Sequence, residues 1–200
     1  MASKFAHDIL QETRREQGQK DQNCWIFVQY LENLRRKEKS FTFRINTENK
    51  GIPSCVVWMT PAMRAAFERF GWFVCLDAMK RQLNQFHWPY VGPVVLDENR
   101  KVTVIAEAFV NSETLDQYAF IMKSIFEMAP GRTKENVAAI YGDCFLRRSL
   151  IDLIGMPLST RVFWDHYHLL QQVWPRGLGP YWFERVRLCE WFCERGNISQ

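Results

Sequence analysis

The stretch "GWFVCLD" at residues 71–77 decides the fold expected of this chain. Its four apolar residues read as the spine of a buried strand, and that strand ends on a carboxylate, Asp77. A second apolar run, "VAAIYGD" at residues 137–143, ends in the same way on Asp143. If these two strands are neighbours in a sheet, their ends bring two aspartates to one shared point.

The segments around these two runs predict an α/β chain with a mixed sheet. The order from residue 73 onward is β-β-β-α-β-α-β-α, and the first three strands pair most simply as an antiparallel meander. Prolines in the second strand predict an irregularity there or a place near an edge, and either Ser112 or Thr114 begins the first helix. The expected strands are 73–77, 87–97, 101–110, 137–142 and 160–165, and the expected helices are 113–129, 145–155, 166–174 and 180–195.

A helical and hairpin lead-in precedes this core. Residues 1–39 read as helical, and the runs 41–47 and 54–60 read as the two strands of a hairpin. Thr60 and Pro61 then suit the N-cap and first residue of a short helix that ends at Gly71. We therefore divide the chain into a lead-in (1–70), an incomplete core (71–179) and a C-terminal amphipathic helix (180–200) that can begin a helical insertion.

Composition bounds the class of protein. The chain has 200 residues, of which 14% are aromatic, and a net charge of +4. This aromatic content argues against disorder. The charge permits a nucleic-acid partner without requiring one, because the basic clusters also suit solvated helix faces. No apolar run of about 18 residues predicts a membrane span, and the polar start predicts an intracellular protein that is not secreted.

Two carboxylates at neighbouring strand ends favour a divalent cation. They repel each other unless a cation neutralises them, and Mg²⁺ or Mn²⁺ prefers such oxygen ligands. The chemistry that follows is metal-assisted cleavage or strand transfer of nucleic acid. Basic side chains that could contact phosphates flank the pair, at Lys80, Arg81, Arg147 and Arg148. The alternative is that both aspartates cap turns or helices, with Asp143 as an N-cap.

A zinc site is a separate hypothesis. Cys189 and Cys193 are spaced i, i+4 on the last expected helix, and His166 and His168 precede them. Such ligands could bind zinc. Packing of the thiols on one helix face is the simpler interpretation.

The chain resembles the transposase domain of Mutator-like elements (the MULE domain) in several stretches that occur in order. They are "FVQYLENLRRKEKSFTFRINTENKGIPSCVVWMTPAMRAAFERFG" (27–71), "FVCLDAMKRQLNQFHWPYVGPVV" (73–95), "IAEAFVNSETLDQYAFIMKSIF" (105–126), "VAAIYGDCF" (137–145) and "RVFWDHYHLLQQV" (161–173). The resemblance implies an RNase H-like fold and nuclear DNA transposition through metal-dependent phosphodiester cleavage and strand transfer.

Site residues follow from the same resemblance. Asp77 and Asp143 match the first two acidic ligands of a Mg²⁺ or Mn²⁺ site, and His168, or His166 in another register, matches the histidine after the fifth strand. Where the family has Thr-Tyr shortly after its first Asp residue, this chain has Met79 and Lys80. The family's third acidic ligand has no clear match, although three glutamates lie on the last expected helix: Glu184, Glu190 and Glu194. The chain therefore reads as a truncated or degenerate copy whose enzymatic activity on its own is in doubt.

Two other functions stay open. The chain could be a domesticated, non-catalytic module that binds DNA or protein, or an RNase H-like nuclease that uses Glu107 as a further ligand. The alternation around Glu107 also allows that side chain to lie on the solvent face. DNA is the expected partner, and a homo-oligomer or a C-terminal portion beyond this sequence would supply what the site lacks.

Overall fold

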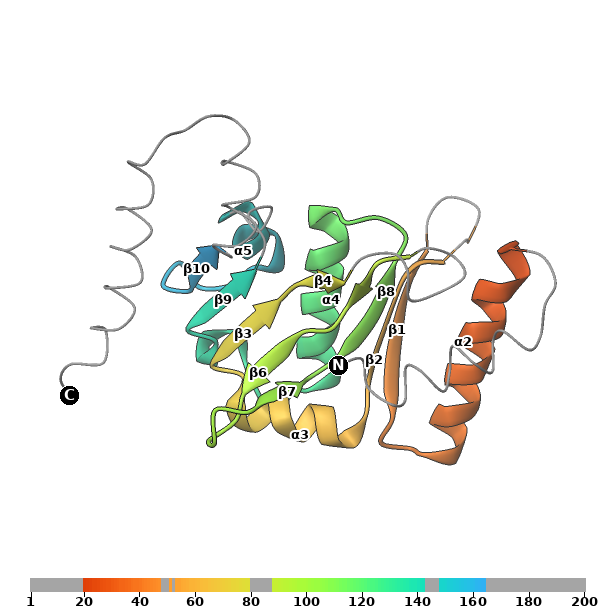
Figure 1. Ribbon diagram of the computed structural model, residues 1–200, viewed down its shortest axis with the longest axis horizontal. Helices are drawn as coiled ribbons and strands as arrows, with labels where there is room; N and C mark the ends of the chain where they lie inside the picture. The colour runs from red at the N-terminus through yellow and green to blue at the C-terminus, as the bar shows by residue number, and fades with distance from the viewer. Residues whose placement is uncertain (1–19, 48–50, 52, 80–87, 143–147, 165–200) are drawn as a thin grey trace.

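The computed structural model describes residues 20–47, 51, 53–79, 88–142 and 148–164. These residues form a mixed α/β structure of two five-stranded sheets with four α-helices (Figure 1). The helices are α2 (Lys20–Lys37), α3 (Pro61–Phe70), α4 (Leu115–Met128) and α5 (Arg148–Ile154). The strands are β1 (Thr42–Thr47), β2 (Pro53–Met59), β3 (Phe73–Leu76), β4 (Ala78–Met79), β5 (Tyr90–Val91), β6 (Val94–Leu96), β7 (Val102–Val104), β8 (Glu107–Val110), β9 (Ala139–Gly142) and β10 (Arg161–Trp164).

The predicted antiparallel meander is confirmed, but each of its three strands is divided in two. β3, β6 and β7 pair in one sheet, and β4, β5 and β8 pair in the other. The break in the second strand falls at Gly92 and Pro93, where proline cannot donate a ladder hydrogen bond. The third strand carries one extra residue between Val104 and Glu107, which is the signature of a β-bulge. The irregularity predicted in the second strand is therefore present. Both segments of that strand, β5 and β6, have a partner strand on each side.

The fourth and fifth predicted strands, β9 and β10, are added to the sheet that contains β3 as parallel strands. β9 pairs with β3, and β10 pairs with β9, both in parallel. Parallel neighbours need a crossover connection, and α4 and α5 lie in the two connections of the chain that lead to β9 and β10. The element order predicted from residue 73 is confirmed as far as Trp164. The helices expected at 166–174 and 180–195 lie outside the described residues.

The lead-in hairpin is confirmed and continues the sheet of the core. β1 pairs with β2, and β2 pairs with β8 through Trp58 opposite Glu107. Thr60 caps α3 by accepting the amide N–H of Met63 at 3.2 Å, and Gly71 ends the helix. The expected N-terminal helix is described from Lys20 to Lys37, and residues 1–19 lie outside the description.

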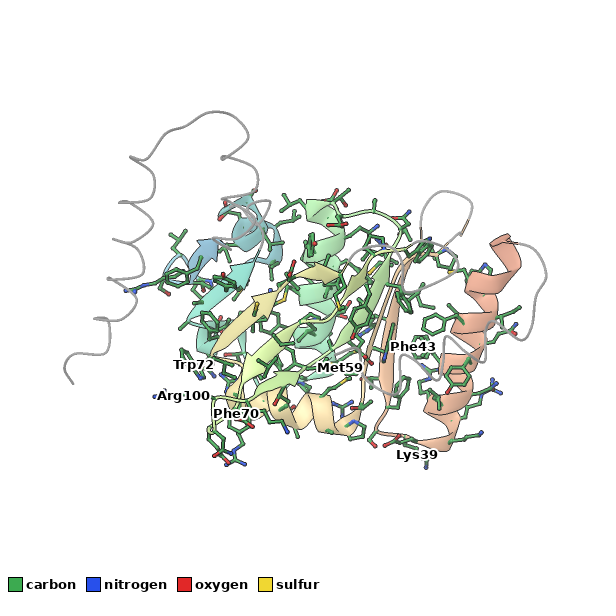
Figure 2. All side chains as sticks on the ribbon, in the orientation of Figure 1. Lys39, Phe43, Met59, Phe70, Trp72 and Arg100 are labelled. Atoms are coloured by element: carbon green, nitrogen blue, oxygen red, sulfur yellow. The ribbon has the colours of Figure 1, made fainter. Side chains whose placement is uncertain are left out.

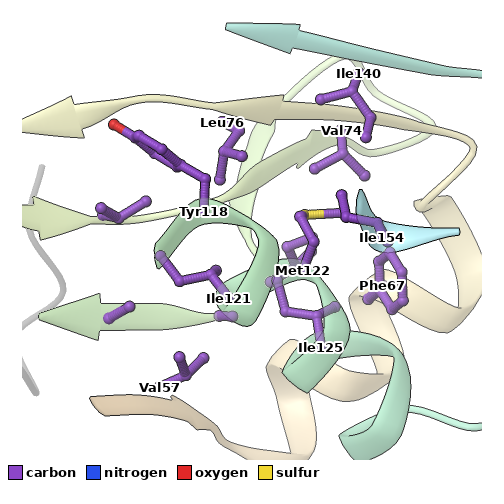
Figure 3. Close-up of a cluster of buried hydrophobic side chains, with 14 of the residues drawn as sticks. Val57, Phe67, Val74, Leu76, Tyr118, Ile121, Met122, Ile125, Ile140 and Ile154 are labelled. Carbon is purple, nitrogen blue, oxygen red and sulfur yellow. The ribbon is translucent and has the colours of Figure 1, made fainter. Parts of the chain in front are cut away.

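The main hydrophobic core lies between one face of the sheets and helices α3, α4 and α5. Val57 of β2, Val74 and Leu76 of β3, and Ile140 of β9 point into it and are all fully buried. Figure 3 shows these side chains against Ile121, Met122 and Ile125 of α4. Alternate residues of a strand face opposite sides of the sheet, so the neighbouring positions of the same strands point to the other face.

A second cluster covers part of that other face. Phe27, Val28 and Leu31 of α2 pack on side chains from the hairpin and its neighbours: Val56, Trp58, Tyr90 and Phe109. In Figure 1, α2 lies at the β1 end of the structure. The strands β3, β6, β7 and β9, which belong to the other sheet, contribute no residue to this cluster.

Candidate functional site

The candidate site begins at the carboxyl end of β3. Residues of β3 and β9 pair in parallel register, with Cys75 opposite Tyr141 and Leu76 opposite Gly142. Asp77 is the residue after Leu76, and Asp143 is the residue after Gly142. The two strands predicted to deliver the acidic pair are therefore neighbours, and they end at the same level of the sheet.

Asp77 occupies an exposed position between two strand segments. Its backbone lies between β3 and β4, and its Oδ1 atom accepts the amide N–H of Ala78 at 2.8 Å. The registers on either side place Gly92 opposite Asp77. The side chain of Asp77 points to the same face as Phe73 and Cys75, since alternation in β3 buries only Val74 and Leu76.

Most other predicted site residues lie outside the described part of the chain. They are Asp143, Lys80, Arg81, Arg147, His166, His168, Glu184, Glu190, Glu194, Cys189 and Cys193. Arg148 is the first residue of α5, and its side chain is not described. The acidic pair, its flanking basic residues and the zinc hypothesis therefore remain predictions.

Glu107 lies in the interior, so the alternative that its side chain lies on the solvent face is wrong. Its side chain is fully buried, and its two oxygens accept hydrogen bonds from Trp58 Nε1 at 2.8 Å and from the Tyr90 hydroxyl at 2.9 Å. Burial, together with the charge of Glu107, raises the pKa of the Tyr90 phenol. The phenol therefore stays protonated and remains a donor to the carboxyl group.

The reason for this burial is that β8 has partners on both sides and cover on both faces. Trp58 stands opposite Glu107 in β2, and Tyr90 comes from β5 on the other side. Gly92 leaves room for this arrangement, because a Cβ atom there would lie 2.9 Å from the ring of Tyr90. This cluster was not predicted from the sequence. Trp58 and Tyr90 lie 49 and 17 residues from Glu107, so no local pattern indicates that they share it as an acceptor.

Asp77 and Glu107 belong to the same row of the sheet but differ in environment. The register places Gly92 between them, so their backbones lie about 10 Å apart across two strand spacings. Asp77 is exposed, whereas the oxygens of Glu107 are held by buried donors.

Within the described ranges, no group of three or more His, Cys, Asp or Glu side chains is placed to hold a metal ion. No described helix is long and apolar enough to cross a membrane. Comparisons with protein-family models, curated proteins and solved structures find no match to this chain.

Proposed function

We propose that this chain is an RNase H-like domain of the MULE transposase type, which uses Asp77 and Asp143 to bind Mg²⁺ or Mn²⁺ and acts on DNA phosphodiester bonds. The substrate class is DNA, which would place the protein in the nucleus. The observation that carries the proposal is the parallel pairing of β3 with β9 in a register that ends both strands together.

The order of strands supports the RNase H-like part of the proposal. The third, second and first core strands, then β9 and β10, follow one another across the sheet. A three-stranded antiparallel meander followed by two helix-connected parallel strands is the arrangement that the resemblance implies. α4 and α5 occupy the two connections in which this arrangement requires helices.

The donor set supports the choice of ion. The carboxylate of Asp77 is exposed, and hard oxygen donors favour Mg²⁺ or Mn²⁺ over softer metals. When bound, such an ion supplies activation of a water or a 3′-hydroxyl group and stabilisation of the leaving oxygen. The chain's own part is to hold the carboxylates at the ends of two paired strands, while the basic residues next to them attract the phosphates of DNA.

Thermal unfolding in the presence of Mg²⁺ or Mn²⁺ tests the metal site. We expect the melting temperature of the unaltered chain to rise with ion concentration, because an ion that binds only the folded state stabilises it by mass action. The rise should vanish in the double variant Asp77→Asn and Asp143→Asn. Asn keeps an oxygen that can accept the N–H of Ala78, so the local fold is preserved while the charge is lost.

A matched control separates the site from a general charge effect. Glu113→Gln removes an exposed carboxylate just before α4 and should leave the metal response unchanged. A flat response in the unaltered chain would contradict the proposed metal site. DNA binding that persists without any metal response would instead favour the non-catalytic DNA-binding module.

Cleavage and strand transfer of a labelled DNA duplex test the reaction itself. Since only two carboxylates are assigned, we expect weak activity, because one missing ligand costs several kcal/mol of transition-state stabilisation. Any activity above background should be lost in Asp77→Asn and kept in Glu113→Gln.

A further inference from the structure

The corner where α2 ends and β1 begins carries a dense set of cations. Residues 35–44 hold five basic residues and one acidic residue, a net charge of +4 that equals the net charge of the whole chain. The rest of the sequence is therefore neutral on balance. Arg64 of α3 joins this set by donating hydrogen bonds to the Ser40 carbonyl at 2.9 Å and to the Thr42 hydroxyl at 3.2 Å. We call the set the basic corner, and its members are Arg35, Arg36, Lys37, Lys39, Arg44 and Arg64.

The basic corner is held on an ordered base. Phe41 is buried, and its amide N–H donates to the Glu38 carbonyl at 2.9 Å. The guanidinium of Arg35 lies over the ring of Phe43, 5.4 Å from the ring centre. Figure 2 labels Lys39, which follows the end of α2 in the turn that leads to β1. The backbone that carries these cations is therefore fixed before any ligand arrives, which lowers the entropy lost on binding.

Ion pairs within the chain neutralise only part of this charge. Two arginines of the corner share the carboxylate of Glu32, and a third pairs with Glu127. Lys37 and Lys39 are exposed and have no ion-pair partner in the described part of the chain. The dipole of α2 favours cations in its last turn, but a dipole does not explain Arg64, which lies near the N-terminal end of α3. The surplus charge is therefore available to an anion outside the chain.

We propose that the basic corner binds the phosphate backbone of duplex DNA. A concentrated basic surface is the electrostatic footprint of nucleic-acid binding. Of the exposed large apolar side chains in the described residues, none belongs to residues 35–44. The corner therefore has no apolar anchor for a lipid surface and no exposed aromatic ring on which single-stranded bases stack. The choice of DNA among polyanions rests on the proposed function.

The basic corner and Asp77 lie at two ends of one row of residues across the strands. Phe43, under the guanidinium of Arg35, is opposite Trp58, which in turn is opposite Glu107. The row continues from Glu107 to Asp77. Four strand spacings separate Phe43 from Asp77, a distance of about 19 Å. Since duplex DNA rises about 3.4 Å per base pair, a duplex with its reacting phosphate at Asp77 meets the corner about six base pairs away. The corner therefore holds the flank of the DNA rather than the reacting bond.

The salt dependence of DNA binding tests the basic corner. We would measure the affinity of the full chain for a fluorescently labelled duplex by anisotropy at several KCl concentrations, with EDTA present so that no divalent ion contributes. The triple variant Arg36→Gln, Lys37→Gln and Lys39→Gln removes three exposed cations of the corner. Each lost phosphate contact lowers the slope of log affinity against log salt by about 0.9. We therefore expect a slope smaller by about 2–3, and an affinity at least about tenfold weaker at about 0.1 M KCl.

A matched variant with the same loss of charge separates a site from general attraction. Lys101→Gln, Lys123→Gln and Arg161→Gln together remove three exposed cations that lie elsewhere on the fold. This variant should keep the slope within about 0.5 of that of the unaltered chain. Circular dichroism checks that both triple variants are folded. If the corner variant is not, the pair Lys37→Gln and Lys39→Gln should still lower the slope by about 1–2.

Four results would overturn the proposal. Equal losses in the two triple variants would show that only net charge matters, and an unchanged slope in the corner variant would show that DNA contacts lie elsewhere. No binding of the duplex by the unaltered chain would also reject it. Loss of binding to phosphatidylserine vesicles in the corner variant, with DNA binding unchanged, would assign the corner to a membrane surface.

The metal titration separates this inference from the proposed catalytic function. DNA binding through the corner, together with a melting temperature that does not respond to Mg²⁺ or Mn²⁺, would keep the basic corner and reject the metal site. A metal response that vanishes in the variant lacking both aspartates, together with DNA binding that does not depend on the corner, would keep the metal site and reject the corner.

Discussion

At the scale of single residues, the two carboxylates in one row of the sheet differ in what surrounds them. Glu107 is held by Trp58 and Tyr90 inside the fold, whereas Asp77 is exposed at a strand end. A buried polar group is tolerated only when it is hydrogen-bonded. Glu107 therefore ties β2 and β5 to β8 and serves the fold.

Exchange of Glu107 for glutamine tests this structural role. Gln replaces one acceptor oxygen by an NH₂ donor, so one of the two buried donors facing it loses its partner. We expect Glu107→Gln to lower the free energy of unfolding by about 1–3 kcal/mol, measured by urea denaturation. Glu127→Gln makes the same change at an exposed carboxylate paired with Arg44 and should cost less than about 1 kcal/mol. Equal losses in the two variants would argue against a structural role for Glu107.

At the scale of elements, the structure decides which of the two predicted candidates, Ser112 or Thr114, is the N-cap of α4. The side chain of Thr114 accepts the amide N–H of Gln117 at 3.4 Å, while the hydroxyl of Ser112 donates to Asn111 outside the helix. We expect Thr114→Ala to lower the free energy of unfolding by about 1 kcal/mol, as loss of an N-cap does. Ser112→Ala should change it by no more than about 0.5 kcal/mol. The same urea denaturation measures both variants, and the reverse order would make Ser112 the cap.

The elements that sequence could predict are those whose signals are local. The apolar run from Phe73 to Leu76 predicted β3, and Thr60 with Pro61 predicted the start of α3, because capping depends on residues three apart. The surroundings of Glu107 were not predictable in this way. Its donor Trp58 lies 49 residues earlier, and only the pairing of β2 with β8 brings the two together.

The candidate site was predictable to the same extent. Two apolar runs that end on aspartates indicated the strands, and the parallel register of β3 and β9 is what makes those strands end together. A third ligand has no local signal, because ligands that meet in space can lie anywhere in the sequence. The division of the meander strands could be predicted only in part. Pro93 indicated the break in the second strand, whereas no residue pattern indicated the bulge after Val104.

At the scale of the whole molecule, the hairpin and the core share one interior. β2 pairs with β8, and Val57 of the hairpin lies in the same hydrophobic cluster as Val74 of β3. A division of the chain near residue 70 would cut through this cluster. Folding units are defined by shared burial, so we expect the described lead-in and core to unfold together.

A matched pair of valines tests this cooperativity. Val57 and Val74 are both fully buried, one on each side of the expected domain border at Gly71. We expect Val57→Ala and Val74→Ala each to lower the free energy of unfolding by about 1–3 kcal/mol, since each removes buried apolar volume. In both variants, circular dichroism and tryptophan fluorescence should follow a single coincident transition, because one cooperative unit loses all of its structure at once. If Val57→Ala instead produced an early transition that changed only part of the circular dichroism or fluorescence signal, the hairpin would be a separate folding unit. The sheet around Asp77 would then stay folded after the hairpin had unfolded.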